Sequence, residues 1–129
     1  MTFMPYLLVG LGGFIGANAR FIIDRLVGAM VETRFPLGTF LINVSGSLML
    51  GILGAVTAQK FVPTSEAMRL ALGVGFLGAF TTFSTFELQT YVLFDKGLWL
   101  TATTNIFASL FLGLLAVHAG IWVAKMWLI

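Results

Sequence analysis

The stretch Gly75-Phe-Leu-Gly-Ala-Phe-Thr-Thr-Phe-Ser-Thr-Phe86 decides the fold that we predict for this chain. It lies inside an apolar segment, 67–94, that is longer than one helical crossing of a bilayer. Glycine tolerates unwound backbone, so Gly75, Gly78 and the polar run from Thr81 predict a broken helix. At membrane depth, unwound backbone survives only where it is buried in protein, lines a cavity or coordinates an ion. We therefore expect the functional site at this interruption.

The rest of the sequence places this segment among four membrane spans. Hydrophobic residues make up 59% of the 129 residues, charged residues only 9%, and the mean hydropathy is +1.03. A hydrocarbon core about 30 Å thick needs roughly 20 helical residues per crossing, so four spans fill this length. We predict a single all-α integral membrane domain, residues 1–129, with a broken third helix. The approximate spans are 5–23, 38–58, 67–94 and 99–127.

Charged residues and prolines indicate where these spans end, and small residues indicate where they pack. Asp24 and Arg25 are expected in the first connection, and Pro36 is expected to open the second helix. Lys60 and Pro63 are expected to close that helix. One face of the first span is nearly bare backbone and should pack tightly against a neighbour. The residues of this face are Gly10, Gly12, Gly13 and Gly16.

The basic residues specify almost no orientation in the membrane. On the predicted topology they divide into Lys60, Arg69 and Lys125 on the side of the termini, and Arg20, Arg25, Arg34 and Lys96 on the other side. Orientation follows the difference in Lys and Arg between the two sides, so such a chain can insert both ways. Our working hypothesis is an antiparallel, dual-topology homodimer. The alternative is that one loop charge dominates the orientation.

Polar groups at membrane depth need a partner or water. Two interpretations of Asn43 stay open, a hydrogen bond between helices worth roughly 1 kcal/mol or a donor to an anion. Carbonyls from the turn between Gly78 and Thr81, doubled by a second copy, would form a four-oxygen cage for a monovalent structural cation. Glu87 is expensive in lipid and is expected to be engaged. Arg20 is assigned an anchoring role, an anion-attracting role, or both.

Composition excludes several function classes. The chain has no cysteine, which excludes disulfides and thiolate metal sites. Its basic residues are scattered, without the clustered stripe that nucleic-acid binding needs. We find no zinc-ligand spacing and no Ser/His/acid arrangement, so we predict that the protein is not an enzyme.

Three motifs, taken in order, carry a resemblance to a known family. They are Gly12-Gly-Phe-Ile-Gly-Ala-Asn-Ala-Arg20, Gly38-Thr-Phe-Leu-Ile-Asn43 and the stretch from Gly75 to Phe86. With them the sequence resembles the Fluc (CrcB) fluoride channel family over essentially its whole length. The resemblance implies an antiparallel dimer of four-helix subunits with two fluoride pathways and a central structural sodium ion (Na+). It also implies passive fluoride export across a bacterial inner membrane, which protects the cell from fluoride toxicity.

The same resemblance assigns roles residue by residue. The roles implied are pore-lining aromatics for Phe83 and Phe86, a pore-facing amide for Asn43, sodium-binding carbonyls for Gly78 and Thr81, and the first hydroxyl of a polar track for Ser109. Two departures follow Ser109, because Gly113 and Val117 stand where one family member carries serine and threonine. There we expect water or another helix to supply the polar contact. A third departure is the pair Glu87 and Gln89. Here the acid stands two positions away from its place in the family pattern.

Two other functions remain as alternatives. A small multidrug-resistance-type, proton-coupled exporter is also a dual-topology four-helix dimer, but it needs a glutamate in its first helix, and no acid precedes Asp24 here. A membrane scaffold without transport would use its polar residues only for helix packing. It would tolerate substitution of Phe83.

Overall fold

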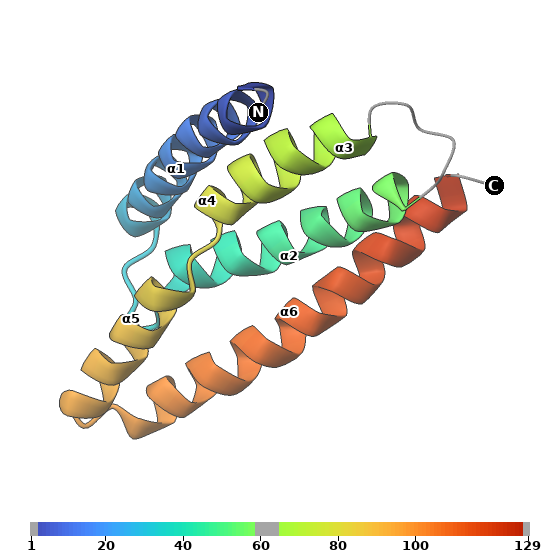
Figure 1. Ribbon diagram of the computed structural model, residues 1–129. Helices are drawn as coiled ribbons and strands as arrows, with labels where there is room; N and C mark the ends of the chain where they lie inside the picture. The colour runs from blue at the N-terminus through green and yellow to red at the C-terminus, as the bar shows by residue number, and fades with distance from the viewer. Residues whose placement is uncertain (1–2, 59–64, 128–129) are drawn as a thin grey trace.

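The computed structural model describes residues 3–58 and 65–127, and four helices in it are long and apolar enough to cross a membrane. They run over Met4–Met30 (α1), Leu37–Thr57 (α2), Glu66–Asp95, and Trp99–Trp127 (α6). No strand occurs in the described ranges. Figure 1 shows these helices as one bundle, with the start of α1 at the top of the view and the end of α6 toward the upper right. The prediction of an all-α protein with four membrane-spanning helices is confirmed.

The first helix is longer than predicted. We expected it to end at Ile23, but α1 continues to Met30 and ends where Val31 adopts an extended conformation. Asp24 and Arg25, expected in the connection, are helical. Charged side chains interrupt a membrane span without interrupting a helix, so α1 extends past the apolar stretch.

The other helix ends agree with the sequence where the structure describes them. Pro36 directly precedes α2, as predicted for a residue that opens a helix. The fourth span begins at Trp99 and ends at Trp127. Lys60 and Pro63, predicted to close the second span, lie outside the described residues.

The third span consists of several pieces. In order they are α3 (Ser65–Met68), a π-helical segment η1 (Arg69–Leu77), α4 (Gly78–Phe80) and α5 (Phe83–Asp95). Thr81 and Thr82 are extended and separate α4 from α5. The broken third helix is therefore confirmed, but the break lies at these two threonines and not at the glycines. Gly75 is helical within η1, and Gly78 has helical dihedral angles, φ −62° and ψ −35°.

Gly75 serves close packing instead of unwinding. A Cβ atom added at Gly75 would lie 2.7 Å from the Val9 carbonyl oxygen of α1. Gly16 of α1 is equally tight, because its Cβ would collide with the Phe76 carbonyl oxygen. Gly10, in contrast, has open space around it. Thus α1 and η1 meet backbone to backbone, as the small-residue face of the first span predicts, although Gly10 takes no part.

The same device joins α2 to α6. A Cβ atom at Gly51 of α2 would meet the Val117 carbonyl, and one at Gly120 of α6 would meet the Leu48 carbonyl. The two helices therefore run side by side at a separation that leaves no room for side chains at these points.

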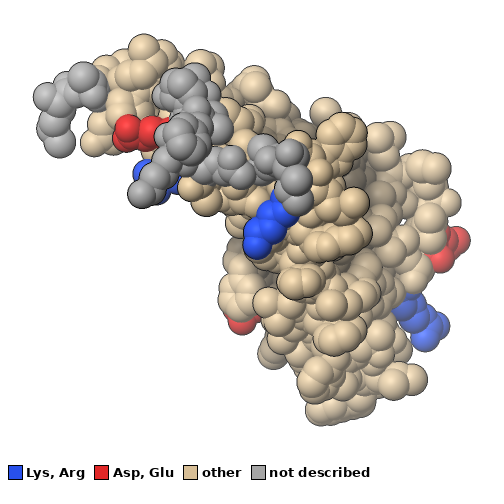
Figure 2. Space-filling view, turned by 90° about the vertical axis from the view of Figure 1, so that its right-hand side faces the viewer, with Lys and Arg blue, Asp and Glu red and all other residues tan. Residues whose placement is uncertain are grey.

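Most large apolar side chains lie on the outside of the single chain. Among the described residues, one buried apolar cluster contains Ile42, Leu53, Leu77 and Phe80, whereas Phe14 is 70% and Leu100 82% exposed. Figure 2 shows one face on which charged side chains are few and isolated. This distribution suits lipid or a second protein surface as the surroundings.

We predict that Gly16→Ala destabilises the protein whereas Gly10→Ala does not. Overpacking at Gly16 should cost about 1–3 kcal/mol, while alanine at Gly10 should be neutral or should gain up to about 1 kcal/mol from helix propensity. The measurement is the temperature at which each detergent-purified variant loses its native gel-filtration peak. Equal melting of Gly16→Ala and the unmodified protein would contradict the close contact.

Candidate functional site

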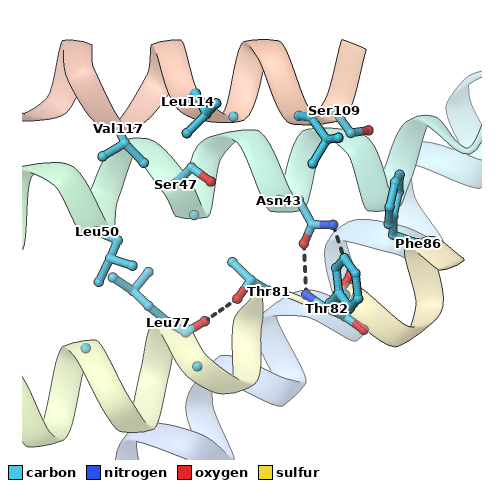
Figure 3. A pocket seen from close by; sticks show the side chains of 16 residues that line it. Asn43, Ser47, Leu50, Leu77, Thr81, Thr82, Phe86, Ser109, Leu114 and Val117 are labelled. Carbon is cyan, nitrogen blue, oxygen red and sulfur yellow. Dashed lines mark hydrogen bonds between the residues drawn. The ribbon is translucent and has the colours of Figure 1, made fainter. Parts of the chain in front are cut away.

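A cavity of about 400 Å³ lies between α2, α6 and the break in the third span. Figure 3 shows polar side chains reaching it from α2, from the break and from α6. Its lining includes every predicted site residue except Arg20: Asn43, Gly78, Thr81, Phe83, Phe86 and Ser109. The structure thus brings together residues that are far apart in the sequence.

Asn43 on α2 is hydrogen-bonded to both backbone groups of Thr82. Thr82 N–H donates to Asn43 Oδ1 at 2.8 Å, and Asn43 Nδ2 donates to the Thr82 carbonyl at 3.0 Å (Figure 3). The amide oxygen therefore replaces the acceptor that a continuous helix would have supplied to Thr82 N–H. The helix-joining interpretation of Asn43 is thus confirmed. A primary amide has two N–H groups, so the second N–H is a further donor at the cavity wall.

The break also leaves carbonyl groups without their helical donors. Thr82 N–H would ordinarily donate to the Gly78 carbonyl four residues earlier, but it donates to Asn43. Thr81 turns back, since both its N–H and its hydroxyl donate to the Leu77 carbonyl, at 3.0 and 2.9 Å. The last carbonyls of α4 are therefore acceptors that the helix does not satisfy. In the described part of the chain, no group of three or more His, Asp or Glu side chains could hold a metal.

Phe83 and Phe86 occupy the first turn of α5, directly after the break. Their ring centroids are 5.9 Å apart with planes tilted by 38°. Phe83 is 67% exposed in the single chain, and Phe86 is half-buried. Thr82 caps this helix, because its hydroxyl oxygen accepts a hydrogen bond from Thr85 N–H at 3.3 Å. The cap fixes the direction in which the two rings leave the break.

Ser109 of α6 lies at the cavity and begins a buried hydrogen-bond chain. Its hydroxyl donates to Asn105 Oδ1 at 3.2 Å, and Asn105 Nδ2 donates to Thr90 Oγ1 of α5 at 2.8 Å. Thr90 in turn donates to the Phe86 carbonyl at 2.7 Å. Thr90 and Asn105 were not predicted as site residues. The spacing of Asn105 and Ser109, one helical turn apart, could have indicated that their side chains are neighbours.

Gly113 and Val117, the two residues after Ser109 that depart from the family pattern, also line the cavity. Gly113 and Val117 continue from Ser109 along α6, and neither carries a hydroxyl. Ser47 on the facing helix α2 lines the same cavity, and its Oγ lies 3.8 Å from the place where a Cβ of Gly113 would be. The neighbouring helix α2 therefore presents a hydroxyl close to Gly113.

Arg20 does not reach this cavity. It is half-buried in a separate hollow of about 170 Å³, which it shares with Asp24, Thr39 and Thr85. Thr82 lines both the cavity and this hollow, so the hollow that contains Arg20 adjoins the break. Glu87, which we expected to be engaged, is exposed on α5.

Gln89 lies in the middle of α5. Its Oε1 is enclosed and has no hydrogen-bond partner among the described residues. It lines a hollow with Arg34 and Lys96. Glu87 and Gln89 therefore have different surroundings, because Glu87 is exposed and Gln89 is half-buried.

Several known proteins are similar in sequence to this chain over most of its length. A relative from Solibacter usitatus, named fluoride-specific ion channel FluC, is 39% identical over 122 residues, which are 95% of this chain and 99% of the relative. A protein of Streptomyces avermitilis, named fluoride-specific ion channel FluC 1, is 44% identical over 95% of this chain and 97% of its own length. A FluC of Methylococcus capsulatus is 44% identical over 91% of this chain, which spans 51% of that relative. The sequence profile described as "CrcB-like protein, Camphor Resistance (CrcB)" matches residues 7–121, and this chain belongs to that family.

Proposed function

We propose that this multi-pass membrane protein is a fluoride-selective channel that gives passive export of fluoride and so protects the cell from fluoride toxicity. The observation that carries the proposal is the single cavity that joins Asn43, Phe83, Phe86 and Ser109 beside the helix break. The relatives named as fluoride-specific channels support it, since they match nearly the whole chain. These relatives come from bacteria, so we infer a bacterial inner membrane as its location.

The chemistry of the cavity suits a small, strongly hydrated anion. Fluoride must exchange its water for donors, and the second Asn43 N–H and the hydroxyls of Ser47 and Ser109 are donors that line the cavity. The rim of an aromatic ring is the positive part of its quadrupole, so Phe83 and Phe86 presented edge-on attract an anion. Larger halides approach a ring edge and a hydroxyl less closely, so narrowness combined with donors gives selectivity.

We infer that the working unit is an antiparallel, dual-topology homodimer. In one chain the cavity is open and Phe83 is 67% exposed, so a second surface is needed to enclose a pathway. The exposed apolar side chains supply such a surface. The near balance of basic residues between the two sides favours insertion in both orientations.

We also propose a structural sodium ion at the centre of that dimer. The Gly78 and Thr81 carbonyls at the break, two from each chain, would hold it with four hard oxygen ligands. The site fits because the break has removed the helical donors from carbonyls at this end of α4. Bound there, the cation would add positive charge between the two pathways.

The first test of the function is passive efflux from liposomes loaded with either fluoride or chloride. We expect fast fluoride release with negligible chloride release. Phe83→Ile should slow fluoride release by about tenfold, because it removes a ring edge from the pathway. Phe14→Ile is the matched control, since Phe14 is equally exposed but lies on α1 away from the cavity. Absence of fluoride release from a folded dimer would reject the channel and direct the search to proton-coupled drug transport.

The second test concerns the arrangement of the dimer. The chain has no cysteine, so introduced thiols have no background. Lys96→Cys and Lys125→Cys each place one thiol on an exposed residue. Lys96 directly follows α5 and precedes α6, and Lys125 lies near the other end of α6. Coexpressed with different tags, the two variants should crosslink to each other much more than to themselves. Crosslinks only between identical positions would indicate a parallel dimer.

The third test concerns the cation. Binding to the folded state alone raises its stability, so the purified dimer should melt several degrees higher in sodium chloride than in choline chloride at equal ionic strength. Potassium chloride serves as the control for cation size. Identical melting temperatures in all three salts would reject the sodium site and leave the fluoride pathway unaffected.

A further inference from the structure

Ser109, Asn105, Thr90 and the Phe86 carbonyl form one chain of hydrogen bonds that starts at the cavity and ends inside the protein. The three successive distances are 3.2, 2.8 and 2.7 Å. Asn105 is 1% and Thr90 6% exposed, so water does not compete with these bonds.

The last member of the chain sets the direction of every bond in it. A backbone carbonyl can only accept, so Thr90 must donate its single hydroxyl hydrogen to Phe86. The Thr90 oxygen is then left as an acceptor, and Asn105 must present Nδ2 to it. The amide therefore turns Oδ1 toward Ser109, whose hydroxyl hydrogen is donated to that oxygen.

This direction has a consequence for the pathway. A serine hydroxyl has one hydrogen, so Ser109 can donate either to Asn105 or to an anion in the cavity, but not to both. An anion that binds at Ser109 must draw the hydrogen away from Asn105. When the anion leaves, the hydrogen returns to an acceptor that the buried chain holds in place.

We propose that Asn105 is a positioning residue that keeps the Ser109 hydrogen when the pathway is empty and thereby weakens fluoride binding at Ser109. This inference rests on the proposed function. Conduction needs a site that an ion can leave as well as enter, and a competing internal acceptor lowers the affinity without removing the donor. Thr90 acts one step further away, by fixing the orientation of the Asn105 amide.

A purely structural role would not need the Ser109 bond. Among the described residues, the side-chain hydrogen bond that links α5 to α6 is the one between Asn105 and Thr90, fifteen residues apart in the sequence. The bond from Ser109 to Asn105 lies within α6 and adds no link between helices. Its distinctive property is that it holds the hydrogen of a cavity-lining hydroxyl.

The test is the fluoride concentration that gives half-maximal efflux from liposomes, together with the maximal rate. Asn105→Leu removes the acceptor and leaves no space for a water to replace it. We expect the half-saturating concentration to fall by about two- to tenfold, the worth of one hydrogen bond, and the maximal rate to fall as well. Asn105→Val is the smaller second variant, in case leucine prevents folding, and gel filtration establishes that each dimer is intact.

Two controls separate positioning from packing. Asn18→Leu removes another side-chain amide, one that bonds only the Phe14 carbonyl on its own helix, and should leave the half-saturating concentration unchanged. In a Ser109→Ala background, Asn105→Leu should no longer shift that concentration, because no hydrogen remains to be released. If Ser109→Ala abolishes efflux, the shift in the two Asn105 variants alone decides.

The outcomes are distinguishable. An unchanged or raised half-saturating concentration in the Asn105 variants, or the same fall in the Ser109→Ala background, would overturn this inference while the channel assignment stands. No fluoride efflux from the unmodified protein would overturn the proposed function, and the inference with it.

Discussion

The hydrogen-bonded pair of Asn43 and Thr82 is the interaction on which the rest of the site depends. An unsatisfied peptide group at membrane depth costs several kcal/mol, and the Asn43 amide accepts from the Thr82 N–H that the break leaves without a helical partner and donates to the Thr82 carbonyl. One side chain on α2 therefore permits the third span to break between α4 and α5. The break then determines where Phe83 and Phe86 lie, and it strips the helical donors from carbonyls at the end of α4.

Backbone contact through glycine is the second constraint. At Gly51 and Gly120 the helices α2 and α6 touch without intervening side chains, and at Gly16 and Gly75 α1 touches η1. Lipid offers no hydrophobic drive for helices to associate, so close backbone approach must supply much of the attraction. This packing holds the scaffold while leaving the cavity between α2, α6 and the break open on one side. The cavity of a single chain is therefore open on one side, which is the physical argument for the second copy that we propose.

The cavity also explains how the chain departs from its family pattern without losing polarity. Along α6, Gly113 and Val117 carry no hydroxyl, but Ser47 projects from the opposite wall close to Gly113. An anion responds to the position of a donor and not to the helix that supplies it, so either wall can provide the contact. In contrast, the Ser109 hydroxyl donates its hydrogen to a buried amide.

The sequence by itself determined the spans, because a crossing needs roughly 20 apolar residues and this chain has four such stretches. The resemblance to the Fluc family also grouped Asn43, Phe83, Phe86 and Ser109 as pathway residues, and all four line one cavity. The exact place of the break was not readable, since a glycine that unwinds a helix and a glycine that admits a neighbouring backbone look the same in a sequence. Only the tertiary structure decided this, by putting the Val9 carbonyl against Gly75 and leaving the extended backbone to Thr81 and Thr82. It likewise decided that Asn105 bonds Thr90 and Ser109, because hydrogen-bond partners depend on how α5 and α6 face each other, which periodicity does not specify.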